Sequence, residues 1–448
     1  MNGKPVILGG TPIVINAPES LFKWPIITKE DEDAALDVLR RGAMSGTDVT
    51  RQFETEFKTW QGRAYGLGYN NGTGALLGAL WACDVGIGDE VICPSLTYWA
   101  SAIPVFDLGA TVVFADCDPE TLCISPDDIE HRITKRTKAI MVVHYLGHPC
   151  EMDKILEIGK KHKVKVIEDF SHAQGGLYKG KKVGSWGDVA ASSLMSGKSF
   201  AIGEAGILVT DDKLIYEKAM AFGHYERSGE LTDEWLVSYA GLPMGGYKHR
   251  MHQISAAVGR VQLKYYDARA QEIRDAVNYF WSKLAAAGVK CLRAHRIDAS
   301  LGNMSGWYVP YGHYDPDANG GLHISHVLAA IKAEGIEVAA GGNKPLHTHP
   351  LFHTADIFGH GKPTRIANSD WDVRTGDASL PITEAVGERL LSVPYFKKLN
   401  KEWIDKYAEA YIRVLTATDE IKKLNLETVD VGGWHLSSKV SPERAGSK

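Results

Sequence analysis

Several features that would place this 448-residue chain in other protein classes are missing from it. No stretch approaches the ~18 consecutive apolar residues that a membrane-spanning helix needs. The N-terminal sequence lacks the basic start and the sustained apolar run of a signal peptide. The net charge of −5 provides no overall positive field to attract nucleic acid. We therefore expect a cytoplasmic protein with neither a membrane nor a nucleic acid as partner.

The cysteines form no recognisable motif. None of the six belongs to a C-x-x-C pair, and several lie in apolar runs, where a thiol behaves as a small hydrophobic side chain. They are Cys83, Cys93, Cys117, Cys123, Cys150 and Cys291. This pattern is typical of a reducing compartment such as the cytoplasm.

Common ligand motifs are absent as well. The chain has no P-loop and no G-x-G-x-x-G after its first predicted strand, which disfavours ATP and NAD. The histidine-rich stretch from His347 to His353, "HTHPLFH", has no cysteine or acidic cluster nearby in sequence. We therefore expect no metal site there.

The composition, with 44% hydrophobic and 23% charged residues, is typical of a globular protein, and the length allows two domains. From about Arg51 to Leu263, helical patterns alternate with short apolar segments that read as strands. These segments are "DEVICPS", "ATVVFADCD", "AIMVVHYLG", "VKVIEDFSH" and "GILVTDD". The alternation predicts an α/β domain with a mostly parallel sheet that helices cover on both faces.

The pattern changes near residue 266. A long amphipathic helix, "DARAQEIRDAVNYFWSKLAAAG", is followed by strand candidates at "WYVPYG" and "IEVAAG". We predict an N-terminal segment over residues 1–50 that packs on both domains and a large domain over 51–265. A smaller α+β domain over 266–428 and a flexible, polar tail over 429–448 complete the prediction.

A possible anion site lies at "NNGTGALLGAL". Gly72, Thr73 and Gly74 stand where a loop turns into a helix, so free backbone N–H groups and the threonine hydroxyl could bind a phosphate. The alternative is an ordinary helix start with Thr73 as its N-cap.

Asp169 and Lys198 are unusual for their surroundings. Asp169 ends a predicted central strand, and ligand-binding groups gather at the carboxyl ends of parallel strands. Lys198 follows the apolar strand "DVAASSLM" and precedes a second glycine-rich turn. A buried lysine loses basicity and becomes a nucleophile that can form a Schiff base, and a buried carboxylate needs a positive partner. A phosphate cradle, a carboxylate and a buried lysine together suit pyridoxal phosphate (PLP).

The sequence resembles a known family, the DegT/StrS-type PLP-dependent sugar aminotransferases of fold type I. The resemblance extends from "MSGTDVTRQFETEF" to "LPITEAVGERLLSVP". It is densest in "NNGTGALLGALWACDVGIGDEVICPSLTYWASA", from "VIEDFSHAQGG" to "GEAGILVTDD", and in "GYKHRMHQISAAVGRVQL". It implies a fold-type-I transferase with a seven-stranded-type sheet in its large domain and a smaller C-terminal domain.

The resemblance also implies roles for individual residues. Lys198 matches the Schiff-base lysine and Asp169 the partner of the ring nitrogen. Gly72 and Thr73 match the phosphate-binding pair, and Ser193 matches a further phosphate ligand. Each lies in the corresponding motif of this sequence.

Four further positions follow from the same motifs. Tyr98 matches the aromatic residue that stacks on the cofactor ring, and His172 matches a Gln/His position beside that ring. Either could instead be a core side chain. Lys248 stands where the family often has an asparagine that reaches the cofactor phosphate of the neighbouring subunit. Arg250 keeps its place in the motif and is a candidate for binding a substrate carboxylate, with a structural salt bridge as the alternative.

The resemblance thus predicts a homodimeric enzyme with shared active sites. It would move an amino group from glutamate or glutamine to a keto-sugar or keto-cyclitol, with a nucleotide-linked keto-sugar as the alternative acceptor. The related dehydratases carry histidine in place of the lysine, and Lys198 argues against them. A non-catalytic PLP-binding or regulatory protein of the same fold, or a generic α/β binding protein, remains a rival.

Overall fold

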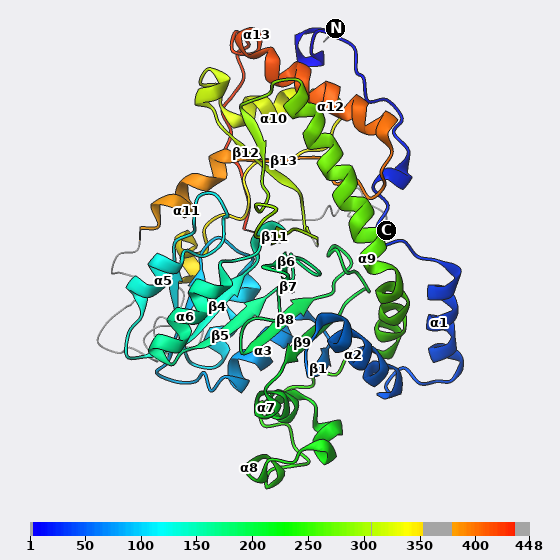
Figure 1. The fold of residues 1–448 in the computed structure, drawn as a ribbon, viewed down its shortest axis with the longest axis vertical. Helices are drawn as coiled ribbons and strands as arrows, with labels where there is room; N and C mark the ends of the chain where they lie inside the picture. The colour runs from blue at the N-terminus through cyan, green and yellow to red at the C-terminus, as the bar shows by residue number, and fades with distance from the viewer. Residues whose placement is uncertain (1–2, 306, 353–378, 435–448) are drawn as a thin grey trace, which may run out of the picture.

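The computed structural model describes residues 3–305, 307–352 and 379–434. Its larger part is built on a seven-stranded sheet in the order β1-β9-β8-β5-β4-β2-β3 (Figure 1). The strands are β1 (Tyr65–Tyr69), β2 (Glu90–Pro94), β3 (Thr111–Ala115), β4 (Thr137–Val143), β5 (Lys165–Asp169), β8 (Val189–Ser193) and β9 (Gly206–Thr210). Only β9 runs against its neighbours within this sheet. The predicted α/β fold with a mostly parallel sheet is confirmed.

Both faces of the sheet are buried, as expected for parallel strands. In β4, Ile140 packs in a cluster with Ile155 of α6, whereas its neighbour Met141 packs in a second cluster with Leu76 of α3. The helices of this part are α2 (Asp48–Gln61), α3 (Gly72–Ala82), α4 (Pro104–Asp107), α5 (Pro126–Arg132), α6 (Met152–His162), α7 (Lys213–Gly223) and α8 (Glu234–Val237). Helix α3 is buried almost all round, which is why its sequence, "GTGALLGALWA", is nearly free of polar residues.

Helix α9 (Gln253–Ala286) joins the two parts of the chain and runs from beside α1 and α2 to α12 (Figure 1). It begins 14 residues before the amphipathic segment that the sequence suggested, and it passes without a break through the expected domain boundary at residues 265 and 266. Buried residues along its whole length therefore pack in the hydrophobic cores of both parts.

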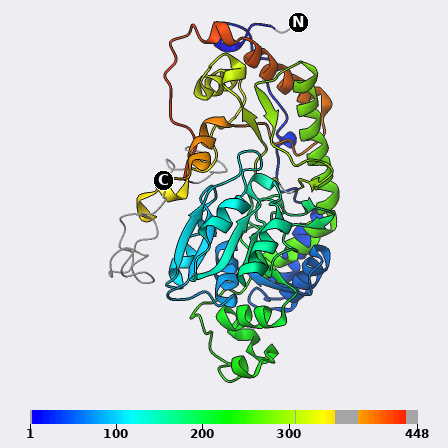
Figure 2. The ribbon, with the colours of Figure 1, turned by 60° about the vertical axis from the view of Figure 1, so that its left-hand side comes forward.

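The smaller part lies above the sheet and opposite α7 and α8 (Figure 2). It has a three-stranded sheet in the order β10 (Leu292–Ala294), β12 (Tyr311–Tyr314) and β13 (Leu390–Ser392). Helices α10 (Ile324–Ala333), α11 (Pro381–Ala385), α12 (Lys401–Thr416) and α13 (Thr418–Ile421) accompany it. The candidate strand at "IEVAAG" forms only an isolated bridge, from Ala340 to Leu391.

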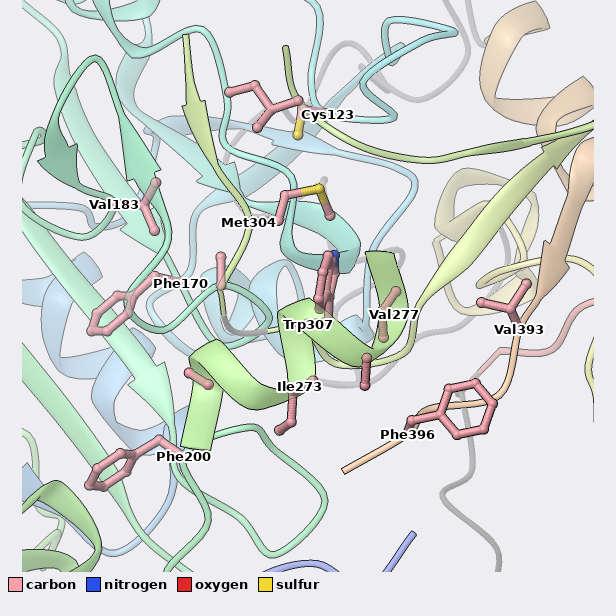
Figure 3. Packing of buried hydrophobic residues seen from close by; sticks show 14 of the residues in the cluster. Cys123, Phe170, Val183, Phe200, Ile273, Val277, Met304, Trp307, Val393 and Phe396 are labelled. Atoms are coloured by element: carbon pink, nitrogen blue, oxygen red, sulfur yellow. The ribbon is translucent and has the colours of Figure 1, made fainter. Parts of the chain in front are cut away.

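A third, small sheet lies between the two parts. It consists of β11 (Gly302–Asn303), β6 (Leu177–Tyr178) and β7 (Lys181–Lys182). Residues of both parts also share one hydrophobic cluster, in which Phe170 and Phe200 are joined with Ile273 of α9 and with Trp307 and Phe396 (Figure 3). This shared core fixes the smaller part against the carboxyl ends of the large sheet.

The N-terminal segment contacts both parts. The backbone N–H of Val6 donates to Glu334 at the end of α10, and Trp24 Nε1 donates to the carbonyl oxygen of Lys198 at 3.0 Å. Helix α1 (Lys29–Arg40) follows and is held to α9 by a hydrogen bond of 2.7 Å from Gln262 to Asp31.

The predicted tail is described only over residues 429–434. Gly432 and Gly433 hydrogen-bond to the backbone of Ala340 and Gly342 in the smaller part. The remainder, residues 435–448, lies outside the described residues. All six cysteines are described; each is a buried free thiol. Within the described ranges, no helix is long and apolar enough to cross a membrane.

Candidate active site

The candidate site lies at the carboxyl ends of β5 and β8. Because side chains alternate along a strand, the adjacent residues Glu168 and Asp169 at the end of β5 face opposite sides of the sheet. Glu168 is fully buried and accepts hydrogen bonds from His144 Nε2 at 3.0 Å and from the backbone N–H groups of Gly184 and Gly187. Burial alone would raise the pKa of Glu168, but the hydrogen bond and charge of His144 lower it. This carboxylate anchors a loop.

Asp169 has a different environment. Its side chain is buried, and its two carboxylate oxygens accept one hydrogen bond each, Oδ2 from Ser101 Oγ at 2.8 Å and Oδ1 from the backbone N–H of Ser171 at 3.0 Å. Ser171 also accepts a bond of 2.8 Å from the N–H of Ser193 at the end of β8. The ends of the two strands are thereby tied together around the carboxylate.

Lys198 is 7% exposed. Burial lowers its pKa from 10.5 to about 8, against the opposing influence of the Asp169 charge. Its Nζ lies 4.0 Å from the centre of the Tyr308 ring, and its carbonyl oxygen accepts the hydrogen bond from Trp24. Two distant segments of the chain therefore fix this lysine, one at its backbone and one at its amine.

His172 also packs against Tyr308. The two rings are stacked, with centroids 4.6 Å apart and an interplanar angle of 9°. Burial, and then the Lys198 charge, lower the pKa of His172 well below its usual value, so the imidazole is neutral at pH 7. Its Nδ1 accepts the backbone N–H of Leu146 at 3.4 Å, which places the ring proton on Nε2.

The start of α3 lies directly against the end of β8. The N-cap residue is Asn71, whose side chain accepts from the N–H of Gly74 at 2.7 Å, so the alternative N-cap, Thr73, is not the cap. A Cβ atom on Gly72 would lie 2.6 Å from the Cβ of Ser193, and only glycine fits this approach. Gly72, Thr73 and Ser193 are thus brought to one place.

Three other residues that the sequence predicted for the site lie farther from Lys198 and, within the described ranges, make no contact with it. Tyr98 is 36% exposed, in the loop that leads to Ser101, and its ring contacts Trp99. Lys248 is exposed, with Nζ 6.0 Å from the centre of the Tyr225 ring. Arg250 is half-buried and forms an isolated bridge with Tyr69 at the end of β1, close in sequence to Gly72. Within this chain, no contact joins these three side chains to Lys198 among the described residues.

The histidine-rich stretch has structural partners. His347 Nδ1 lies 2.7 Å from Ser95 Oγ and its Nε2 lies 3.0 Å from Glu384 Oε1, while His349 packs edge-on against Trp434. His353 lies outside the described residues. No group of three or more potential metal ligands that could hold an ion occurs in the part of the chain that the structure describes.

Sequence reasoning missed Trp24, Ser101, Ser171 and Tyr308. Ser101 follows Tyr98 by three residues, and Ser171 follows Asp169 by two, so both stand beside predicted residues; spacing alone does not say which serine faces the carboxylate. Tyr308 comes from the smaller part, and only the packing of the two parts brings it to Lys198.

The sheet, the carboxylate at the end of its central strand and the buried lysine define a fold-type-I transferase of the aminotransferase class. A profile of the DegT/DnrJ/EryC1/StrS aminotransferase family matches residues 25–411. The chain belongs to this family and is an aminotransferase.

Relatives of known name agree with this assignment. The chain is 35% identical to GDP-perosamine synthase of Caulobacter vibrioides over 366 residues, covering 81% of this chain and 89% of that protein. It is 33% identical, over 80% of its own length and 84% of the other's, to a Micromonospora echinospora protein named for L-glutamine:3-amino-2,3-dideoxy-scyllo-inosose aminotransferase activity. The crystal structure of an aminotransferase from Psychrobacter cryohalolentis superposes with a TM-score of 0.77 at 28% identity, covering 89% of this chain and all of that one.

Proposed function

We propose that this protein is a PLP-dependent aminotransferase that moves the amino group of glutamate or glutamine to a keto-sugar or keto-cyclitol. The observation that carries the proposal is the environment of Lys198. This lysine is buried, and burial lowers the pKa of its amine to about 8 although the nearby charge of Asp169 acts to raise it. A lysine in such a setting can react as a neutral amine near physiological pH.

The residues present fit PLP. The close approach of Gly72 to Ser193 at the start of α3 leaves backbone N–H groups and the hydroxyls of Thr73 and Ser193 as ligands for its phosphate. Asp169, held by two donors, would accept a hydrogen bond from the N–H of the protonated ring nitrogen. Tyr98 would cover one face of the ring, with His172 beside it.

When bound, PLP accepts an amino group at its aldehyde carbon, and its ring takes up negative charge from the adjacent carbon of the donor. The chain supplies the groups that handle protons. Lys198 would hold the cofactor at Nζ and, once released as a free amine, would take the proton from the donor carbon and deliver it to the carbon that receives the amino group. His172, neutral and protonated at Nε2, can donate a hydrogen bond within the site.

The acceptor class is inferred from the relatives. A perosamine synthase acts in GDP-sugar chemistry, and the Micromonospora protein is named for a free aminocyclitol precursor, so both a nucleotide-linked and a free cyclic ketone remain candidates. Arg250 is the candidate ligand for the carboxylate of the amino donor. We favour a free keto-sugar or keto-cyclitol as acceptor, because the N-terminal "VILGGTPIV" resembles that branch.

We further propose a cytoplasmic homodimer with shared active sites. Lys248 is exposed on the single chain, in the motif whose family counterpart reaches the neighbouring subunit. A lysine there would contact a phosphate as a point charge, in place of the amide of asparagine.

An acceptor screen tests this proposal. The purified protein with PLP is given L-glutamine or L-glutamate, and the amino product is measured with a free keto-cyclitol, a free keto-sugar and a nucleotide-linked keto-sugar. We expect turnover with at least one free cyclic ketone. Turnover with the nucleotide-linked ketone alone would select the alternative acceptor. Binding of PLP without reaction with either donor would favour the non-catalytic protein instead.

A further inference from the structure

Ser101 makes a direct contact with the carboxylate on which the proposed cofactor depends. It ends the short helix η3 (Trp99–Ser101) after β2, and its side chain is 1% exposed. Its Oγ lies 2.8 Å from Asp169 Oδ2, a bond between residues 68 positions apart in the chain. A buried hydroxyl bonded to a buried carboxylate is a strong, orienting contact.

The direction of this hydrogen bond can be deduced. An ionised carboxylate only accepts, so the single hydroxyl proton of Ser101 is donated to Asp169. The Oγ1 of buried Thr97 lies 3.3 Å from Ser101 Oγ. Because the proton of Ser101 is already used, Thr97 is the donor in that contact. Two hydrogen bonds therefore run in series: Thr97 donates to Ser101, and Ser101 donates to Asp169.

The other oxygen of Asp169 is held by the N–H of Ser171 at 3.0 Å. With one donor on each oxygen, the plane of the carboxylate is fixed, and one lone pair of each oxygen remains for a further donor. Tyr98, the expected partner of the cofactor ring, stands between Thr97 and Ser101 in the same loop. The loop that would carry the aromatic face therefore also orients the carboxylate.

We propose that Ser101 is a positioning residue that holds the Asp169 carboxylate in line with the ring nitrogen of PLP. This inference rests on the proposed function. Without the hydroxyl, Oδ2 loses its side-chain donor and the carboxylate is free to turn within a buried site. The hydrogen bond between Asp169 and the ring nitrogen then weakens, while the other contacts to the cofactor are kept.

Binding measurements with two cofactors test this role. Dissociation constants of the apoprotein are measured for PLP and for its analogue with carbon in place of the ring nitrogen, which has no N–H for Asp169. We expect Ser101→Ala to weaken PLP binding about tenfold and to leave binding of the analogue unchanged. Ser101→Cys, which keeps the size of the side chain but is a weak donor, should behave like Ser101→Ala.

Ser185→Ala is the matched control. Ser185 is equally buried, and its hydroxyl donates to the carbonyl of Gln61, away from Asp169. This variant should bind both cofactors as the wild type does. In an Asp169→Ala background, Ser101→Ala should have no further effect on PLP binding, because the two residues act through one contact.

The outcomes distinguish a failure of the role proposed for Ser101 from a failure of the proposed PLP-dependent function. Equal losses for both cofactors, or no loss for either, would overturn the role of Ser101 while leaving a PLP enzyme. Failure of the wild-type protein to bind PLP would remove the proposed function and the inference with it. If Ser101→Ala does not fold, the comparison of Ser101→Cys with the wild type decides the question.

Discussion

The amine of Lys198 and the ring of Tyr308 are in direct contact, with Nζ 4.0 Å from the ring centre, although they belong to the two different parts of the chain. An aromatic face stabilises an ammonium by about 1 kcal/mol, whereas the drop in pKa to about 8 corresponds to roughly 3 kcal/mol in favour of the neutral amine. Burial therefore outweighs the attraction of the ring. Packing of the smaller part against the sheet brings the Tyr308 ring onto the amine of Lys198.

Tyr308→Ala should reverse this effect. Removal of the ring admits water to Lys198, and its pKa should rise toward the ordinary value of a lysine. The pH midpoint for reaction of the apoprotein with PLP would move upward, and the rate at pH 7 would fall several-fold. Tyr308→Phe keeps the ring and should react like the wild type; if it behaved like Tyr308→Ala, the hydroxyl and not the ring would be responsible.

The pKa of Lys198 also predicts the pH dependence of the unmodified protein. Only the neutral amine attacks the aldehyde of PLP, and neutral amine accumulates as the pH rises through about 8. The rate constant for combination of apoprotein and PLP should therefore rise about tenfold for each pH unit below 8 and level off above it. Stopped-flow absorbance from pH 6 to 9 measures this profile. A midpoint near 10.5 would show that Lys198 is solvated.

Glu168 and Asp169 should respond oppositely to neutral substitution. Glu168→Gln removes a fully buried carboxylate that binds His144 and three backbone N–H groups, so we expect a loss of about 3 kcal/mol in the free energy of unfolding. Asp169→Asn should unfold at nearly the wild-type denaturant concentration but lose at least 100-fold in transamination rate. Denaturant titration and a transamination assay of both variants check this, and an Asp169→Asn enzyme with normal activity would contradict it.

Gly72→Ala tests the proposed phosphate-binding site at the start of α3. The added Cβ would lie 2.6 Å from Ser193 Cβ and 2.9 Å from its backbone nitrogen, so backbone must shift. We expect a loss of about 1–3 kcal/mol in stability and a clear loss of PLP affinity. Gly86→Ala is the control, because its Cβ would meet no atom within 4 Å. Equal PLP affinity of the two variants would argue against a phosphate site at Gly72.

The sequence predicted the large sheet well, and it indicated the candidate site, because both depend on local patterns. Short apolar strands alternate with helices, and Asp169 and Lys198 stand out as charged residues in apolar surroundings at strand ends. Trp24, Ser101 and Tyr308 follow no such pattern, since tertiary packing alone brings them to the site. The start of α9 was missed because buried residues of its first turns, such as Ala256, Ala257, Gly259 and Val261, lie on more than one side of the helix and weaken the amphipathic pattern.

The most direct test is the visible absorbance of the protein with PLP, before and after L-glutamine or L-glutamate, for the wild type and Lys198→Ala. We predict a yellow wild-type protein that loses its colour with at least one donor and regains it with a cyclic ketone. Lys198→Ala should show neither the wild-type band nor turnover. A wild-type protein that stays colourless with PLP, or a Lys198→Ala variant that reacts like the wild type, would contradict the central role of Lys198.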